Sequence, residues 1–188
     1  MSTSTLVTRF ALALALLGPI DALDRDVQQA VQEGRRPAFE SFMRALSDTR
    51  QGAVVCGGLL IVAVATGPAG PATARVALAA LVPVNLVVQG IKLSANRTRP
   101  DGTRDRPNSS FPSSHAANAA AIALVLALRW PRLSPAFALL AALVAFSRVY
   151  LNRHFLSDVL VGAAIGVALS WLTVRWLRSR GWTWQERA

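Results

Sequence analysis

Two histidines are the side chains whose type and surroundings best suit catalysis, and the chain has no others. His115 ends a polar segment that reads NSSFPSSH, and an apolar stretch follows it directly. His154 lies in a second polar segment, SRVYLNRHFLSDVL, at residues 147 to 160. An imidazole can act as a nucleophile, a general base or, once protonated, a general acid near neutral pH. A lone histidine at a helix end is often only structural, so each one needs support from its neighbours.

Asp158 stands four residues after His154. If a helix starts near His154, the two side chains share one helix face, and the carboxylate can hold the imidazole by its ring N–H and raise its basicity. A carboxylate that orients a histidine is half of the usual arrangement around an activated nucleophile. The same spacing also fits an ordinary pair on a helix surface, so the pair alone does not establish a nucleophile.

Cations gather in the same polar segments. Residues 92 to 106 include five of them, which would repel one another without an anion in their midst. Arg148 stands at the end of an apolar stretch, where an unpaired charge costs about 2.5 to 3.5 kcal/mol on insertion into a membrane. We expect a helix to begin near His115 with Ser113 or Ser114 as its cap, so that its free N–H groups face the cations. This geometry predicts a phosphate-binding site.

Six apolar stretches must position these segments. They cover Leu6 to Ile20, Gly52 to Gly67, Val76 to Ile91, Ala116 to Leu128, Pro135 to Phe146 and Val159 to Leu172. Each is shorter than the roughly 20 residues that cross a bilayer, and runs of about 10 to 14 also occur as buried helices of soluble proteins. A chain of 188 residues, 53% hydrophobic and 16% charged, cannot hide six all-apolar helices from water. We therefore predict an all-α fold, a six-transmembrane-helix bundle in a single membrane-embedded domain over residues 1 to 188.

The segments between these stretches have patterns of their own. Residues 21 to 51 predict two amphipathic helices, separated by Gly34 and Pro37, that lie at the membrane interface after the first span; a partner-binding arm is the alternative. Residues 67 to 74, GPAGPATA, predict a turn. The pair Gly162 and Gly166 predicts close helix packing within the chain rather than a dimer seam. The first apolar stretch also has the length of a secretory signal, but no convincing cleavage site follows it.

Charge and cysteine content narrow the partners. The chain carries 20 Lys and Arg against 10 Asp and Glu, and all but one of the cations are Arg. This excess favours an anionic partner, either a lipid or a nucleic acid. The cations lie at helix ends and in the two histidine-bearing segments with few aromatic residues among them, which favours a lipid. Cys56 is the only cysteine, so the chain can form neither an internal disulfide nor a Cys-based metal site.

Three segments together resemble the signature of the type 2 phosphatidic acid phosphatase superfamily. KLSANRTRP at residues 92 to 100, PSSH at 112 to 115 and SRVYLNRHFLSD at 147 to 158 match its Lys-x6-Arg-Pro, Pro-Ser-Gly-His and Ser-Arg-x5-His-x3-Asp elements in order and spacing. The match covers residues 92 to 158 and uses both histidines, which makes it far more specific than a single short motif. At one position the chain departs from the family, because Ser114 stands where Gly is usual and a need for positive φ there would be strained.

The resemblance implies a phosphatase mechanism without a metal ion or a cofactor. His154 would attack phosphorus to form a phosphohistidine, Asp158 would orient it, and His115 would protonate the leaving oxygen and then activate water. The phosphate oxygens would be held by Lys92, Arg99, Ser113, Ser114 and Arg148. Arg97 and Arg153 lie outside the fixed positions, and we expect them at the substrate headgroup or on the surface.

A membrane lipid phosphate is the substrate class that a six-span member of this family implies. Phosphatidic acid, phosphatidylglycerol phosphate, undecaprenyl diphosphate and a phosphorylated lipid A all fit, and family analogy favours undecaprenyl diphosphate or a glycerophospholipid phosphate. We expect an integral protein of a bacterial inner membrane with an extracytoplasmic active site, because Arg residues crowd the side that carries both termini. The alternatives are a relative of the vanadium haloperoxidases, which share the pocket signature, a nucleic-acid binder, and a non-catalytic membrane scaffold or transporter.

Overall fold

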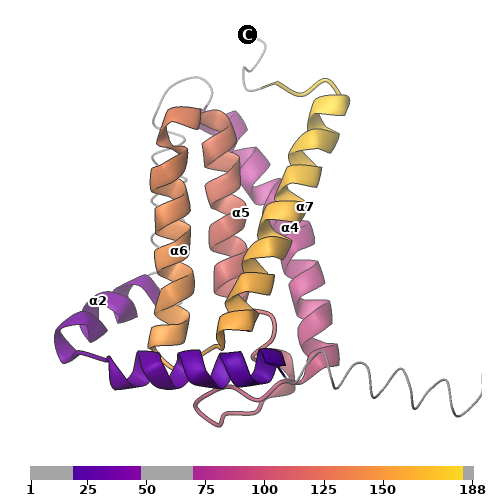
Figure 1. Cartoon of the computed structure of the whole chain (residues 1–188). Helices are drawn as coiled ribbons and strands as arrows, with labels where there is room; N and C mark the ends of the chain where they lie inside the picture. Colours follow the sequence, from indigo (N-terminus) through magenta and orange to yellow (C-terminus); the bar gives the residue numbers. More distant parts are fainter. Residues whose placement is uncertain (1–18, 48–69, 184–188) are drawn as a thin grey trace, which may run out of the picture.

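The computed structural model describes residues 19–47 and 70–183, and all regular secondary structure in this part of the chain is helical. The four long helices run side by side as a bundle (Figure 1): α4 (Gly70–Ala95), α5 (Ser114–Arg129), α6 (Ser134–Tyr150) and α7 (Leu156–Ser179). Two short 3₁₀ helices, η1 (Arg106–Asn108) and η2 (Pro131–Leu133), lie in the connections. The predicted spans Gly52 to Gly67 and, for the most part, Leu6 to Ile20 lie outside the described residues.

The long helices have the length and surface of membrane spans. Within residues 19–47 and 70–183, three segments are long and apolar enough to cross a bilayer, namely α4, the stretch Pro131–Tyr150 and α7. The fourth helix, α5, has 16 residues and rises about 24 Å. Large apolar side chains such as Leu86, Leu139 and Leu160 are 69%, 62% and 60% exposed, which suits hydrocarbon surroundings. The helices predicted for the last four apolar stretches are therefore confirmed, each with longer bounds than the stretch itself.

Glycines let α5 and α7 approach each other closely. A Cβ atom at Gly162 would collide with the carbonyl oxygen of Ser113, and one at Gly166 would collide with that of Ala117. Both contacts lie within the chain, as the GxxxG spacing predicted. They hold the beginning of α5, and with it His115, against α7.

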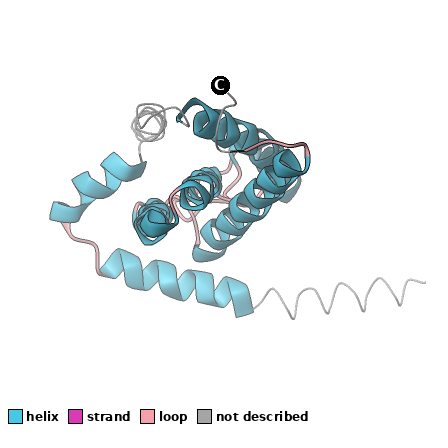
Figure 2. Ribbon diagram, turned by 90° about the horizontal axis from the view of Figure 1, so that it is seen from above, coloured by secondary structure: helices cyan, strands magenta, loops and turns pink. Residues whose placement is uncertain are grey.

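Two amphipathic helices lie across one end of the bundle. Residues 19 to 33 are helical, and α2 (Pro37–Ser47) follows after a turn at Gly34. Both helices run crosswise to the four long helices (Figure 1), and the view along the bundle shows the helix of residues 19 to 33 passing along one side (Figure 2). The prediction of an interfacial helical segment broken at Gly34 is confirmed.

Glutamine side chains fasten the helix of residues 19 to 33 to the end of α6. The Nε2 atoms of Gln28 and Gln32 each donate to the carbonyl oxygen of Val149 at 3.3 Å, and that of Gln32 also donates to Tyr150 O at 3.2 Å. Carbonyl groups in the last turn of a helix lack their usual partner within the helix, and these side chains donate to two of them. The Val149 carbonyl also accepts from the Asn152 N–H at 3.0 Å.

The predicted start of α4 is wrong, whereas the last helix begins close to its expected start. Residues 70 to 74 belong to α4 rather than to a turn, because Pro71 lies in the first helical turn, where its missing N–H costs nothing. The last helix begins at Leu156, two residues after His154, in agreement with the expected start near this histidine. Phe155 is extended at the N-cap position, and its N–H donates to Asp158 Oδ2 at 2.8 Å, which starts the helix one residue later.

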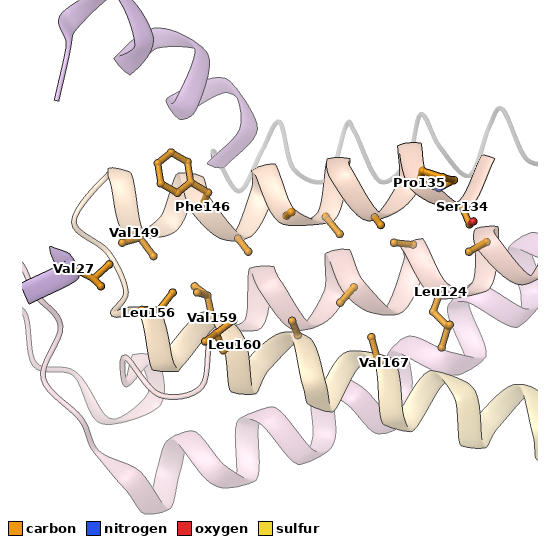
Figure 3. Close-up of a pocket in the computed structure, with 18 of the residues that line it drawn as sticks. Val27, Leu124, Ser134, Pro135, Phe146, Val149, Leu156, Val159, Leu160 and Val167 are labelled. Atoms are coloured by element: carbon orange, nitrogen blue, oxygen red, sulfur yellow. The ribbon is translucent and has the colours of Figure 1, made fainter. Parts of the chain in front are cut away.

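An apolar groove of about 690 Å³ separates α6 from α7 (Figure 3). A row of alanines on α6, at positions 138, 141, 142 and 145, lines it, and such small side chains leave space between helices that both pack on α5. Val27 and Leu156 lie at one end of the groove, and Ser134 and Pro135 lie at the other.

The two ends of the bundle differ in character. The connections at residues 96 to 113 and 151 to 155 meet at the end where the amphipathic helices lie (Figure 1). The opposite end carries arginines stacked on tryptophans: Arg129 on Trp130, Arg175 on Trp171 and Arg180 on Trp176. All predicted site residues therefore belong to one end, as a single active site requires.

Candidate active site

A polar cavity of about 990 Å³ opens at the end of the bundle where the two connections meet. Six of the eight predicted site residues line it, namely Lys92, Arg99, Ser114, His115, Arg148 and His154. The other two, Ser113 and Asp158, do not line the cavity and are each 0% exposed. The structure thus brings together residues that the sequence places up to 66 positions apart, from Lys92 to Asp158.

The hydrogen bonds of His154 determine which of its ring nitrogens can react. Nδ1 lies 2.7 Å from the carbonyl oxygen of Ser110, and a carbonyl can only accept. In the neutral ring Nδ1 therefore carries the hydrogen, and the lone pair is on Nε2 at the opposite side of the ring. His154 is 2% exposed and lines the cavity, so the protein holds it in one orientation with a nucleophilic nitrogen available.

Asp158 supports this histidine differently from the prediction. Its Oδ2 lies 3.7 Å from Nδ1 of His154, beyond hydrogen-bond distance, because the Ser110 carbonyl takes the ring N–H instead. The same Oδ2 accepts from the Ser110 hydroxyl at 2.5 Å and from the Phe155 N–H at 2.8 Å. Asp158 therefore fixes the segment that carries the Ser110 carbonyl and places a negative charge beside the imidazole.

The beginning of α5 presents free backbone N–H groups near His115. Ser113 is the N-cap, and its hydroxyl accepts from Ala116 N at 3.4 Å. Its own N–H donates to the Asp158 carbonyl at 2.9 Å, which ties the start of α5 to α7. Ser114 is the first helical residue, and Asn96 and Asn152 are the non-glycine residues with positive φ in the described ranges. Serine is therefore unstrained where the family usually has Gly.

Six cations of the described residues line the cavity, and three of them are the predicted phosphate ligands Lys92, Arg99 and Arg148, held by the connections or by α2. Lys92 donates through Nζ to the Ser109 carbonyl. Arg99 donates to Asn108 Oδ1 at 2.6 Å and to the Arg153 carbonyl at 3.1 Å. These contacts fix two of the positive charges without neutralising them, because the partners are neutral oxygen atoms.

Arg148 is the cation with spare hydrogen-bonding capacity. Its Nη1 donates to the carbonyl oxygen of Ser47 at 2.9 Å and to the hydroxyl of the same residue. Its Nε is buried and has no partner among residues 19–47 and 70–183. A buried guanidinium N–H beside a polar cavity favours an anionic ligand there.

The electrostatics of the cavity keep His154 neutral. Burial lowers the pKa of the His154 imidazole from its usual value near 6.5 to about 4; the nearby Asp158 carboxylate opposes this change, and the charge of Arg148 adds to it. At neutral pH the ring therefore carries no proton on Nε2, as a nucleophile requires.

Arg97 is not at the headgroup or on the open surface, where we expected it. Its guanidinium bridges Asp158 and Asp24, at 2.7 and 2.8 Å. Arg153 agrees with the expectation, since it lines the cavity and pairs with Asp101 at 3.0 Å in an exposed position. Sequence reasoning did not single out Asp24, the second partner of Arg97. A pattern could have indicated it, because Asp24 shares one helix face with Val27, Gln28 and Val31 at helical spacing.

Comparison with known proteins identifies the family. The model of the PAP2 superfamily matches residues 73–182, more than half of the chain, and this range contains all eight predicted site residues. The chain belongs to the PAP2 superfamily. The family that the three-part signature indicated is thereby confirmed.

Two bacterial relatives of this PAP2 member are lipid A 1-phosphatases. The one from Porphyromonas gingivalis is 40% identical over 85 residues, covering 43% of this chain and 18% of the relative. The one from Rhizobium johnstonii is 34% identical over 100 residues, covering 47% of this chain and 41% of the relative. The chain thus matches less than half the length of these relatives.

Two solved PAP2 structures share the fold. LpxE of Aquifex aeolicus superposes with a TM-score of 0.68 at 24% identity, covering 80% of this chain and 93% of that one. The transmembrane PAP2 type phosphatidylglycerolphosphate phosphatase of Bacillus subtilis gives 0.66 at 25% identity, covering 95% and 98%. The predicted fold class, an all-α membrane bundle, is therefore confirmed.

Proposed function

We propose that this PAP2 member is an integral-membrane lipid phosphatase that releases a terminal phosphate through a phosphohistidine on His154, without a metal ion. One observation carries the proposal. The reactive nitrogen of His154 is held free by the bond from Nδ1 to the Ser110 carbonyl, inside a cavity lined by Lys92, Arg99 and Arg148. A fixed neutral imidazole among three cations suits attack on a bound phosphate.

The first step forms the phosphohistidine. The Nε2 lone pair of His154 attacks phosphorus, the bond from phosphorus to the leaving oxygen breaks, and that oxygen takes a proton from His115. The negative charge of the bound phosphate favours the protonated form of His115 that this step needs. Positive charge develops on the His154 ring, and the Asp158 carboxylate, 3.7 Å from Nδ1, stabilises it.

The second step returns the enzyme to its starting state. A water molecule attacks phosphorus, His115 takes a proton from the water, and the phosphorus–nitrogen bond breaks with its electron pair returning to Nε2 of His154. Lys92, Arg99 and Arg148 hold the equatorial oxygens in both steps, so these cations supply the charge neutralisation that metal ions supply in many phosphoryl-transfer enzymes.

A lipid is the substrate that the surroundings of the cavity favour. The cavity opens where apolar helices meet amphipathic ones, so a phosphate on an apolar anchor reaches it from the bilayer surface. The similar proteins are a lipid A 1-phosphatase and a phosphatidylglycerolphosphate phosphatase, and both names denote enzymes that act on lipid phosphates. We propose the same class for this chain, with the active site on the extracytoplasmic side.

A substrate panel tests the proposal. The purified protein in detergent is given phosphatidic acid, phosphatidylglycerol phosphate, undecaprenyl diphosphate or lipid A bearing a 1-phosphate, and released inorganic phosphate is measured. We expect release from at least one lipid by the wild type and none by His154→Ala. Folded wild-type protein that releases phosphate from no lipid would refute the proposal, and bromide oxidation with vanadate and peroxide would favour a haloperoxidase relative instead.

A further inference from the structure

Arg97 pairs with carboxylates from different parts of the chain. Nη1 donates to Asp158 Oδ1 at 2.7 Å, and Nη2 donates to Asp24 Oδ2 at 2.8 Å and to Oδ1 of the exposed Asp21 at 3.3 Å. The guanidinium also lies 4.5 Å from the centre of the Phe155 ring. In the chain, Phe155 stands between the proposed nucleophile His154 and the first residue of α7. A planar fork can bind two carboxylates and stack on a ring at once, which a lysine ammonium cannot do with the same geometry.

Asp24 is a buried carboxylate that reaches this site from the helix of residues 19 to 33. It is 2% exposed, and it accepts from the backbone N–H and the hydroxyl of Ser157 at 2.8 and 2.5 Å. Ser157 is the second residue of α7 and immediately precedes Asp158. Burial of an unpaired carboxylate destabilises the folded state. Asp24 is paired, because it accepts hydrogen bonds from the first turn of the helix that carries Asp158.

We propose that Asp24 and Arg97 are positioning residues of the active site, which hold the Asp158 carboxylate and through it set the orientation and charge environment of His154. The inference rests on the proposed phosphohistidine mechanism. It assigns a positioning role in the active site to the helix of residues 19 to 33, which lies outside the three-part signature. Neither residue lines the cavity, so neither touches the phosphate.

The charges of this network give the proposal a distinctive signature. The charged and titratable groups that share the cavity with His154 are Arg35 before α2, Arg44 of α2, Lys92 of α4, Arg99, Asp101 and Asp105 of the connection after α4, His115 of α5, Arg148 of α6, and Arg153, which precedes His154 in the chain. Asp158 of α7 lies behind the ring, 3.7 Å from Nδ1. Asp24, Arg97 and Asp158 together carry one net negative charge. Arg97→Gln makes this trio more negative and favours a proton on His154, whereas Asp24→Asn makes it neutral and disfavours that proton.

The test compares kcat, KM and the pH dependence of kcat/KM among variants, on whichever lipid the wild type hydrolyses. The acid limb is the part of this pH profile where kcat/KM falls as the pH is lowered and His154 takes a proton. We expect Arg97→Gln and Asp24→Asn each to lower kcat by about 10- to 100-fold, as loss of a partner behind a functional histidine does, with KM little changed. The acid limb should move up in pH in Arg97→Gln and down in Asp24→Asn, each by on the order of one unit. The phosphate group of the substrate takes up protons at the same pH in every assay. A difference in the acid limb between variants therefore reports a change in the pKa of a protein group.

Further variants separate positioning from charge. The double variant Asp24→Asn/Arg97→Gln restores the net charge of the trio, so its acid limb should return to the wild-type position while kcat stays low. Arg97→Lys should keep the limb in place and recover only part of kcat. The matched controls are Asp26→Asn on the same helix and Arg104→Gln in the same connection, both exposed, and both should behave as the wild type.

The outcomes separate failure of the inference from failure of the mechanism. If the wild type turns over and His154→Ala does not, but Arg97→Gln and Asp24→Asn match the two controls, the positioning role is wrong and the mechanism stands. Acid limbs that move the same way in both variants, together with equal losses of thermal stability, would show a purely structural network. A wild type that hydrolyses no lipid counts against the proposed function. If Arg97→Gln or Asp24→Asn does not fold, the kinetics of Arg97→Lys decide the question alone. A kcat of Arg97→Lys equal to that of the wild type would then overturn the inference.

Discussion

The main-chain oxygen of Ser110 lies 2.7 Å from Nδ1 of His154, so a backbone group rather than a carboxylate sets the tautomer of the proposed nucleophile. The Ser110 hydroxyl in turn donates to Asp158 Oδ2 at 2.5 Å. One residue therefore connects the histidine to the aspartate that its family signature pairs with it. This arrangement divides two tasks, because Ser110 orients the ring and Asp158 supplies the charge.

Asp158→Asn should lower kcat by about 10- to 100-fold with substrate affinity little changed. The amide removes the negative charge that stabilises the developing imidazolium, and it cannot accept from the Ser110 hydroxyl, the Phe155 N–H and Arg97 as a carboxylate does. The loss stays moderate because the Ser110 carbonyl still fixes the tautomer. Steady-state phosphate release measures kcat and KM; unchanged kcat would leave Asp158 without a role in the reaction.

His154 should titrate near pH 4, well below the usual value for histidine. Its pKa is lowered to about 4, chiefly by burial, so the ring stays neutral as pH falls through 6.5 and takes a proton only near 4. The chain has two histidines, so the variant His115→Ala, purified through a tag without histidine, leaves His154 as the single ring in a nitrogen-15 NMR titration. The same spectrum reports the tautomer, and we expect hydrogen on Nδ1. A midpoint at or above 6.5, or hydrogen on Nε2, would contradict the geometry of the site.

Replacement of His154 and replacement of His115 should have different effects on phosphoenzyme formation and turnover. His154→Ala removes the attacking nitrogen, so no phosphoenzyme should form and turnover should stop. His115→Ala removes the general acid and base, which is worth about 10² to 10⁴ in rate, so labelled phosphoenzyme should still form slowly from a substrate with a good leaving group. Acid-quenched trapping with phosphorus-32 substrate distinguishes the two variants. The assay is repeated in excess chelator, where full wild-type activity is expected; loss of turnover that Mg²⁺ restores would show that the reaction needs a metal ion.

The sequence was most informative where chemistry restricts both residue type and spacing. His115, His154 and the three cations could be placed in one site because the signature fixes their separations at helix ends. The four long helices followed from apolar stretches. Their bounds did not, because residues such as Pro71 and Ser147 continue a helix beyond the apolar part.

The supporting network could not be predicted, because its members are distant in sequence and carry no fixed spacing. Arg97 lies 61 residues from Asp158 and 73 from Asp24, and only the folded bundle brings them together. Ser110 acts through its main-chain oxygen, which is the same in every residue type, so no sequence pattern could have marked that contact.

The last prediction concerns the side of the membrane on which the cavity opens. The bundle end opposite the site carries Arg129, Arg132, Arg175, Arg178 and Arg180, and a Lys- and Arg-rich side of short loops stays in the cytoplasm. The site end also has cations, but several are committed to the cavity or to ion pairs such as Arg97 with Asp158. We therefore expect the cavity to face the extracytoplasmic surface, where it meets headgroups of the outer leaflet. In a Cys56→Ser background, Thr103→Cys in the exposed connection at the site should react with a membrane-impermeant thiol reagent in intact spheroplasts. Ser179→Cys, exposed at the other end, should react only after lysis. The reverse pattern would place the active site in the cytoplasm and its substrate in the inner leaflet.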